Sequence, residues 1–138
     1  SRESDVIFDW DEFMSFEGNS GPYIQYSYVR AKKILEKAWT YTLKNIQISQ
    51  KEEKELLSHL LSFPQVLSQA LDGYHAHILC QYVYDASKIF SSLYTNVSIL
   101  QESNEHHRNA RFALLDMYVQ VIETVFRDIL AIPLAQEM

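Results

Sequence analysis

Residues that break helices are rare in this chain, which has three glycines and three prolines among its 138 residues. A fold built from β-strands needs frequent tight turns, and glycine and proline are the residues that make most of them. Between the few breakers, apolar residues recur three and four positions apart, which is the period of an amphipathic α-helix. The sequence therefore predicts an all-α fold, an antiparallel bundle of about five helices.

Local signals predict where the first three helices begin and end. Proline is favoured at the first position of a helix, so Pro22 predicts a helix from 22 to about 43. Ser49 with Glu52 three residues later has the spacing of a capping box and predicts the start of a second helix. Pro64 is expected to end that helix at Phe63 and to open a third one, which closes at residues 72–73.

Two longer helices are expected in the second half of the chain. The first runs from about 75 to 95 and is apolar on most of its surface, so we expect it to be the central helix. Ser103 or Asn104 can cap the second, from about 105 to 130. The short apolar tail after it is expected to pack against the bundle.

We expect one folded domain preceded by a connecting segment. Residues 22–138 are long enough to bury a core, and residues 1–21 read as a lead-in from a preceding domain. The lead-in is too apolar for a free linker, so Trp10, Phe13 and Phe16 are expected to dock on the helices or on another domain. The chain starts at Ser1, and we expect it to be a piece of a longer protein.

Composition and histidine spacing argue against several kinds of site. A single cysteine, Cys80, rules out a disulfide framework and fits a reducing compartment, so we expect a cytoplasmic protein without a membrane partner. His75 and His77 are two positions apart and His106 and His107 are adjacent, so neither pair shares the helix face that a metal needs. We also find no glycine-rich phosphate loop and no nucleophile with a matching base. The residues by themselves predict a helical module without an active site.

One face of the first expected helix combines aromatic rings with cations. Three- and four-residue spacing places on one stripe Tyr23, Tyr26, Arg30, Lys33 and Lys37. Phenol rings followed by cations suit stacking on unpaired bases and holding phosphates. Because the net charge is −6, such binding must be local and must rest partly on stacking. A solvated lysine face, with tyrosines packed on a neighbouring segment, is the alternative that periodicity leaves open.

Several short motifs, taken in order, resemble one family. The first three are Phe8-Asp9-Trp10-Asp11, Phe16-Glu17-Gly18-Asn19-Ser20 and Pro22-Tyr23-Ile24-Gln25-Tyr26. They look like the lead-in to the anticodon-binding domain of arginyl-tRNA synthetases. The resemblance continues through Leu61-Ser62-Phe63-Pro64, His77, Leu79, Tyr82-Val83-Tyr84-Asp85, Phe90, Tyr94, Arg108, Ala110-Arg111-Phe112, Leu114 and the final Met138. Each motif is weak alone, but the ordered set is specific and covers nearly the whole chain.

Two positions depart from the pattern of that family. The family often has proline where this chain has Ala76, and it usually has glycine where this chain has Ala131. Alanine at position 131 puts the turn of the tail, and hence the position of Met138, in question.

The resemblance implies a class I synthetase anticodon-binding domain and a parent enzyme that joins arginine to its tRNA. That reaction uses ATP with magnesium and passes through an arginyl-adenylate. The HIGH and KMSKS signatures of the catalytic domain are absent from this chain, so the fragment itself is expected to be non-catalytic and to hold no cofactor. Its expected partners are an arginine-specific tRNA and the catalytic domain of the same parent chain.

The resemblance also implies where the RNA lies. In that family, tyrosines matching Tyr23, Tyr26 and Tyr94, together with the last methionine, surround the splayed anticodon bases. With the cations on the helix stripe and two arginines in a family motif, the predicted tRNA-binding residues are Tyr23, Tyr26, Arg30, Lys33, Lys37, Tyr94, Arg108, Arg111 and Met138. For the pair Arg108 and Arg111, a structural role beside acidic residues such as Glu105 is equally compatible with the sequence.

Two other functions stay open. A helical protein-interaction module without RNA binding fits the acidic charge, and the same fold occurs in other class I synthetases such as the cysteinyl type. The surface of the first helix separates the first two possibilities. An RNA-binding domain needs a basic face that bears tyrosines there, whereas an interaction module needs an apolar patch.

Overall fold

The computed structural model describes residues 20–38 and 43–138, and all of its regular elements are helical. The lead-in at residues 1–19, with its three aromatic residues, lies outside the described residues, as do positions 39–42. The elements are α2 (Gly21–Lys37), α3 (Lys51–Leu61), α4 (Phe63–Gly73), α5 (Ala76–Asn96), α6 (Glu105–Glu123) and a π-helical segment η1 (Thr124–Ile129).

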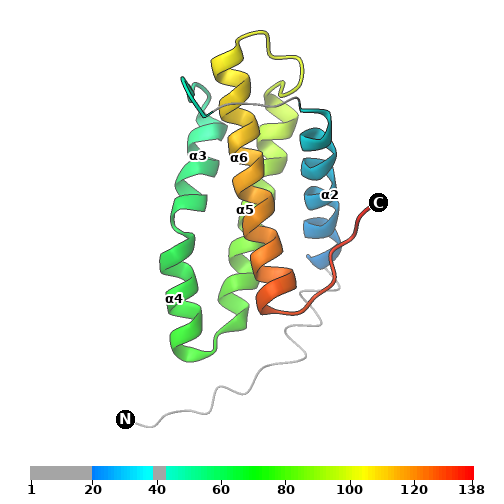
Figure 1. Cartoon of the computed structure of the whole chain (residues 1–138). Coiled ribbons are helices and arrows are strands. Elements are labelled where there is room, and N and C mark those ends of the chain that lie inside the picture. Colours follow the sequence, from blue (N-terminus) through cyan, green and yellow to red (C-terminus); the bar gives the residue numbers. More distant parts are fainter. Residues whose placement is uncertain (1–19, 39–42) are drawn as a thin grey trace.

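These helices form four antiparallel columns (Figure 1). The α3 and α4 helices stack end to end as one column, α2 forms another, and α5 and α6 are the long helices between them. The α5 helix contacts α2, α3, α4 and α6, so the prediction that it is the central helix is confirmed. The all-α antiparallel bundle expected from the sequence is confirmed as well.

A continuous apolar core fills the space between the columns. Each helix contributes the residues of its apolar stripe, among them Ile24, Leu56, Val83, Phe90 and Ile122, which are all fully buried. Burying one such side chain is worth about 1.5–3 kcal/mol, so this core is the main force that holds the helices together.

The first helix is shorter than predicted. It ends at Lys37, where Ala38 adopts an extended conformation and its N–H caps the carbonyls of Ile34 and Leu35. Leu43, the expected last residue, is not helical. The helix begins at Gly21, one residue before the predicted start at Pro22, so the proline lies in the first turn as expected.

The predicted capping box at the start of α3 is wrong. The helix begins at Lys51, and its cap residue Gln50 makes no side-chain hydrogen bond to the helix. The N–H of Ser49 instead donates to the carboxylate of Glu53, at 2.9 Å. Glu53 lies one helical position beyond the residue expected to serve this role, and it is also needed for a buried ion pair described below.

The break between α3 and α4 is a single residue, Ser62. Phe63 was expected to be the break but is the first residue of α4, so the proline sits at the second helical position. The α4 helix ends at Gly73 as predicted, and Tyr74 after it provides the left-handed cap with φ of 56°. Proline thus interrupts the hydrogen bonds without changing the direction of the column.

The last helix begins as predicted and then widens. The side chain of Asn104 accepts a hydrogen bond from the N–H of His107, at 3.1 Å, which confirms it as the cap. The helix continues from α6 into η1 and closes with the N–H of Leu130 bonded to the carbonyl of Val125. The chain then reverses at Ala131, whose φ is 54°.

Ala131 therefore occupies a backbone conformation that favours glycine. A Cβ atom in the left-handed region costs about 1–2 kcal/mol, which is partly offset because glycine is more flexible when unfolded. We expect Ala131→Gly to raise the free energy of unfolding by about 0.5–1 kcal/mol, measured by urea denaturation. The matched control, Ala113→Gly inside α6, should lower it by about 1 kcal/mol. A loss of stability in Ala131→Gly would contradict the assigned backbone conformation.

Three tyrosines in the bundle hold their phenol protons tightly. Burial, followed by a 2.8 Å hydrogen bond to Glu123 and the charge of that carboxylate, raises the pKa of Tyr28 to about 12. Burial also raises the pKa of Tyr82 to about 12 and raises the pKa of Tyr118. These groups are neutral at physiological pH and would have to ionise inside the core at high pH.

Stability is consequently expected to fall in alkaline solution. The unfolded phenol has a pKa of about 10, so the folded state holds its protons more tightly. The stability that the protonated phenol of Tyr28 contributes is fully present below pH 10. It is lost as the pH rises toward the folded-state pKa of about 12. Thermal melts between pH 8 and 12 should show this loss, and Tyr28→Phe should make it smaller.

Candidate nucleic-acid interface

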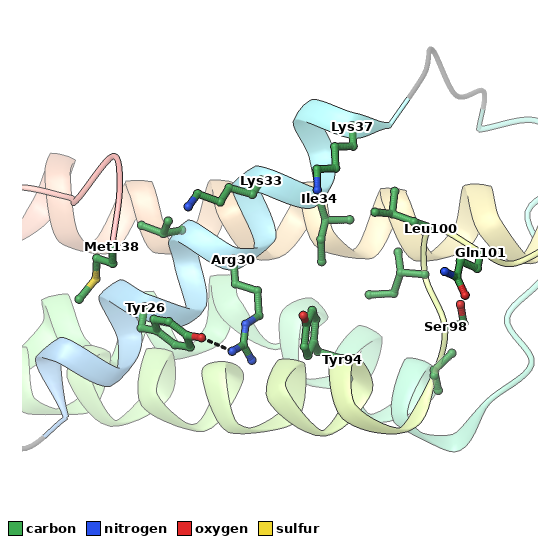
Figure 2. A pocket seen from close by; sticks show the side chains of 13 residues that line it. Tyr26, Arg30, Lys33, Ile34, Lys37, Tyr94, Ser98, Leu100, Gln101 and Met138 are labelled. Atoms are coloured by element: carbon green, nitrogen blue, oxygen red, sulfur yellow. Dashed lines mark hydrogen bonds between the residues drawn. The ribbon is translucent and has the colours of Figure 1, made fainter.

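A groove runs between α2, the end of α5 and the loop that follows it (Figure 2). Its volume is about 450 Å³. The sequence predicted nine tRNA-binding residues, and six of them line this groove: Tyr26, Arg30, Lys33, Lys37, Tyr94 and Met138. The other lining residues are Val29 and Ile34 from α2 and residues 97–101 of the loop.

Two tyrosines and one arginine form the middle of the groove. The guanidinium carbon of Arg30 lies 4.4 Å from the ring centre of Tyr26 and 4.2 Å from that of Tyr94. Arg30 also donates a hydrogen bond to the hydroxyl of Tyr26, which lies one turn before it on α2 (Figure 2). Tyr26 and Tyr94 are 45% and 43% exposed. Each ring therefore has one face against the same guanidinium while part of the side chain stays open to solvent.

The ring of Tyr94 packs against the buried core. Its ring lies 6.3 Å from that of Phe90, which is fully buried and stacks on Tyr118 at 4.9 Å. The ring can therefore present a face to a ligand without first being ordered, so little conformational entropy remains to be lost on binding.

Cations line one side of the groove. Arg30, Lys33 and Lys37 follow one another at turn spacing along α2, and the two lysines are exposed. Among the described residues that line the groove, none has an acidic side chain. A basic face with Tyr26 on α2 and Tyr94 beside it on α5 is thus present despite the net charge of −6, as expected for an RNA-binding domain.

The prediction that Arg111 contacts RNA is not supported, because the side chain is buried in the core. Arg111 is 2% exposed and pairs at 2.7 Å with Glu53, which is 0% exposed. Its other guanidinium nitrogen donates to Glu102 at 2.8 Å and to the carbonyl of Ser98. The structural alternative is therefore the correct one, with Glu53 and Glu102 as partners instead of Glu105.

Arg108 also binds the loop beside the groove. Its guanidinium donates to the carbonyl of Glu102 at 2.9 Å and does not reach the groove lining. The N–H of Asn104, and then Arg111, lower the pKa of Glu102, so that carboxylate stays charged. The two arginines thus hold the loop 97–104, which forms one wall of the groove, instead of lining it themselves.

Tyr23 lies outside the groove as well. Its hydroxyl donates to Ser91 of α5 at 2.8 Å, and its ring packs edge-on against Tyr84 at 5.7 Å. Tyr23 lies near the stripe of Tyr26 on α2, but its side chain packs on the middle of α5 instead of lining the groove. The structure thus places one tyrosine of the family motif against a helix and the other in the groove.

Sequence reasoning missed Gln25, which holds the C-terminal tail. Its side-chain amide donates to the carbonyl of Pro133 and accepts from the N–H of Ala135, both at 2.8 Å. The tail packs on the bundle as expected, through Ile132, Leu134 and Ala135. Met138 at its end reaches the groove beside Tyr26 (Figure 2).

Residues 20–38 and 43–138 contain no cluster of three or more metal-ligating side chains. Cys80 is buried. None of the helices described is both long and apolar enough to cross a membrane. Tyr82 is a core residue that stacks on His59 at 4.2 Å.

Fold and groove together define an all-helical domain with a preformed aromatic and cationic binding surface. Comparison with known families identifies it further: the model of the DALR anticodon binding domain matches residues 24–138. The chain belongs to the DALR anticodon binding domain family, and the recognition made from the sequence motifs is confirmed.

The similar proteins are arginine–tRNA ligases. The chain is 38% identical to that of Clostridium beijerinckii and 36% identical to that of Wigglesworthia glossinidia brevipalpis, in both cases over the whole chain. It spans about a quarter of the length of these curated relatives, 25% and 24%. The solved structure of Thermus thermophilus arginyl-tRNA synthetase matches 94% of this chain and 23% of that chain, with a TM-score of 0.74 and 29% identity.

Proposed function

We propose that this chain binds the anticodon stem-loop of an arginine tRNA as part of an arginine–tRNA ligase. The observation that carries the proposal is the groove in which Tyr26, Arg30 and Tyr94 lie together. The family match and the arginine–tRNA ligases to which the whole chain is similar support it. The same comparisons favour this function over an interaction module without RNA binding.

Stacking and charge have separate roles in the groove. Unpaired bases of an RNA loop can stack on the exposed parts of Tyr26 and Tyr94, while Arg30, held against both rings, offers a cation. Lys33 and Lys37 continue the groove with charges suited to phosphates. Stacking tolerates every base, so the choice among bases must come from hydrogen bonds at base edges, for which main-chain groups near the tail are available.

The rest of the proposal concerns the parent enzyme. We propose that it uses ATP with magnesium, acts in the cytoplasm and carries the catalytic domain outside this chain. Residues 22–138 would then form the RNA-binding domain, and residues 1–21 would connect it to the preceding part. In this arrangement the domain grips the anticodon end and helps to place the acceptor end of the tRNA in the active site.

The test is a titration of the chain with an arginine tRNA anticodon stem-loop, beside a loop with a changed middle anticodon base. We expect the changed loop to bind at least about fivefold more weakly, since a lost base-edge contact costs about 1–3 kcal/mol. Equal binding of the two loops would show that the chain binds RNA without reading the anticodon. No binding to either loop would contradict the proposal for this chain.

The salt dependence of that titration tests the role of the cations. Each phosphate contact of a single strand contributes about 0.7 to the slope of log affinity against log salt. Lys33→Ala should therefore reduce the slope by about 0.7 and weaken the two loops equally. Lys54→Ala on α3, an exposed lysine away from the groove, is the matched control and should leave the slope unchanged.

A further inference from the structure

The C-terminal tail is held to the bundle at two places: the N–H of Ile132 donates to the carbonyl of Phe126 at 2.7 Å, and further along the side chain of Gln25 binds Pro133 and Ala135. The segment 132–138 has no regular structure, and its apolar residues Ile132, Leu134 and Ala135 rest on the bundle. Such contacts hold a segment close to the surface without fixing its register along the surface. Gln25 adds two directed hydrogen bonds, to Pro133 and Ala135, across 108 and 110 positions of sequence.

These two bonds need both halves of a carboxamide. The NH₂ group donates to the Pro133 carbonyl, and the oxygen accepts from the Ala135 N–H. The side chain thus pairs with the tail as a peptide group pairs with a neighbouring strand. A carboxylate of the same shape cannot donate, and an apolar side chain can do neither.

The same helix turn presents Gln25 to the tail and Tyr26 to the groove. Met138 lines the groove and also a smaller, mainly apolar cavity of about 260 Å³, whose other walls include Pro22, Gln25 and Phe126. The anchor at Ala135 lies three residues before Met138, so only a short span of chain separates the fixed point from the groove.

We propose that Gln25 is a positioning residue that sets the register of the tail and thereby places Met138 at the end of the RNA groove. This inference rests on the proposed function, because the placement of Met138 matters for binding only if the groove takes RNA. Gln25 itself does not contact the RNA and acts through Pro133 and Ala135.

The first test measures how firmly the tail is held in the absence of RNA. In the unaltered chain, hydrogen exchange of the Ala135 amide should be slower than that of the Glu137 amide. Gln25→Leu should accelerate it about 2- to 10-fold, the factor that one lost hydrogen bond gives. Gln25→Glu keeps the acceptor for Ala135 but loses the donor for Pro133, so its effect should be smaller. Gln69→Leu, at an exposed position of α4, is the control. Unchanged exchange in Gln25→Leu would overturn the proposal.

The second test is a cycle of variants in the RNA titration. Gln25→Leu should weaken binding by no more than deletion of residues 133–138 does, and the two changes together should equal the deletion alone. Additive losses would show that Gln25 acts independently of the tail and would overturn the proposal. Tyr94→Ala separates the two ideas: if it weakens binding while Gln25→Leu does not, the groove stands and the positioning role fails. If Tyr94→Ala has no effect either, the proposed function fails, and the exchange test alone decides whether Gln25 holds the tail.

Discussion

Replacing Arg111 with alanine is expected to lower the free energy of unfolding by about 3–5 kcal/mol, because it leaves Glu53 charged and unpaired in the core. The ion pair joins α6 to α3 across 58 positions of sequence at 2.7 Å, and both side chains are buried. A domain of this size is stable by about 5–15 kcal/mol in total, so the change removes a large share of it. Urea denaturation with the fluorescence of the aromatic residues measures the loss.

The control for this prediction is a paired arginine at the surface. Arg127 forms ion pairs with Asp128 at 3.1 Å and Glu123 at 3.7 Å, but 61% of its side chain is exposed. Arg127→Ala should cost far less, because an exposed ion pair contributes little to stability. Arg111→Met combined with Glu53→Leu should recover part of the lost stability, because no buried charge then remains unpaired. Equal losses for Arg111→Ala and Arg127→Ala would contradict the role of the buried pair.

The second large effect concerns RNA binding. Tyr94→Ala is expected to weaken binding of the anticodon stem-loop about 5- to 150-fold, since one base stacked on an aromatic side chain contributes about 1–3 kcal/mol. Tyr94→Phe keeps the ring and should retain most of the affinity. Fluorescence anisotropy of a labelled stem-loop measures both variants, and circular dichroism confirms that they remain folded.

Tyr74 offers a matched control for Tyr94. It is 85% exposed at the end of α4 and lies outside the groove. Tyr74→Ala should leave the affinity unchanged. A loss as large as that of Tyr94→Ala would move the RNA to another face of the domain.

The helices were predictable because each buries a stripe that its own residues define. The period of apolar residues sets a helix's face, and prolines and caps such as Pro22 and Asn104 set its ends. The stripe of α2 also placed Tyr26, Arg30 and the two lysines on one surface without any knowledge of the other helices. Such properties are local in the sequence, and the structure confirms them.

The errors arose where two distant segments meet. No local signal shows that Glu53 is needed to pair with Arg111 instead of serving α3 through the expected capping box. One signal for burial was present, since Arg111 shares its helix face with Leu114 and Leu115, three and four positions later. The separation of Tyr23 from Tyr26 depends on where α5 lies, and the grip of Gln25 depends on the path of the tail.

Ala131 illustrates a third case. The family pattern has glycine there, and alanine raised the question of whether the tail turns in the same way. The structure answers that the turn is made with φ of 54°, so the backbone adopts the conformation that glycine favours. Met138 lies at the groove, beyond that turn and beyond the Ala135 N–H that Gln25 binds.

The most direct test of the RNA groove is an amide NMR titration of the chain with the arginine tRNA anticodon stem-loop. We predict that the largest shift changes fall on the groove, at Tyr26, Arg30, Lys33, Tyr94, residues 97–101 and Met138. The exposed residues of α4, such as Leu71, should barely move. Shift changes centred on α4, or spread evenly over the bundle, would contradict the assignment of the groove as the RNA-binding site.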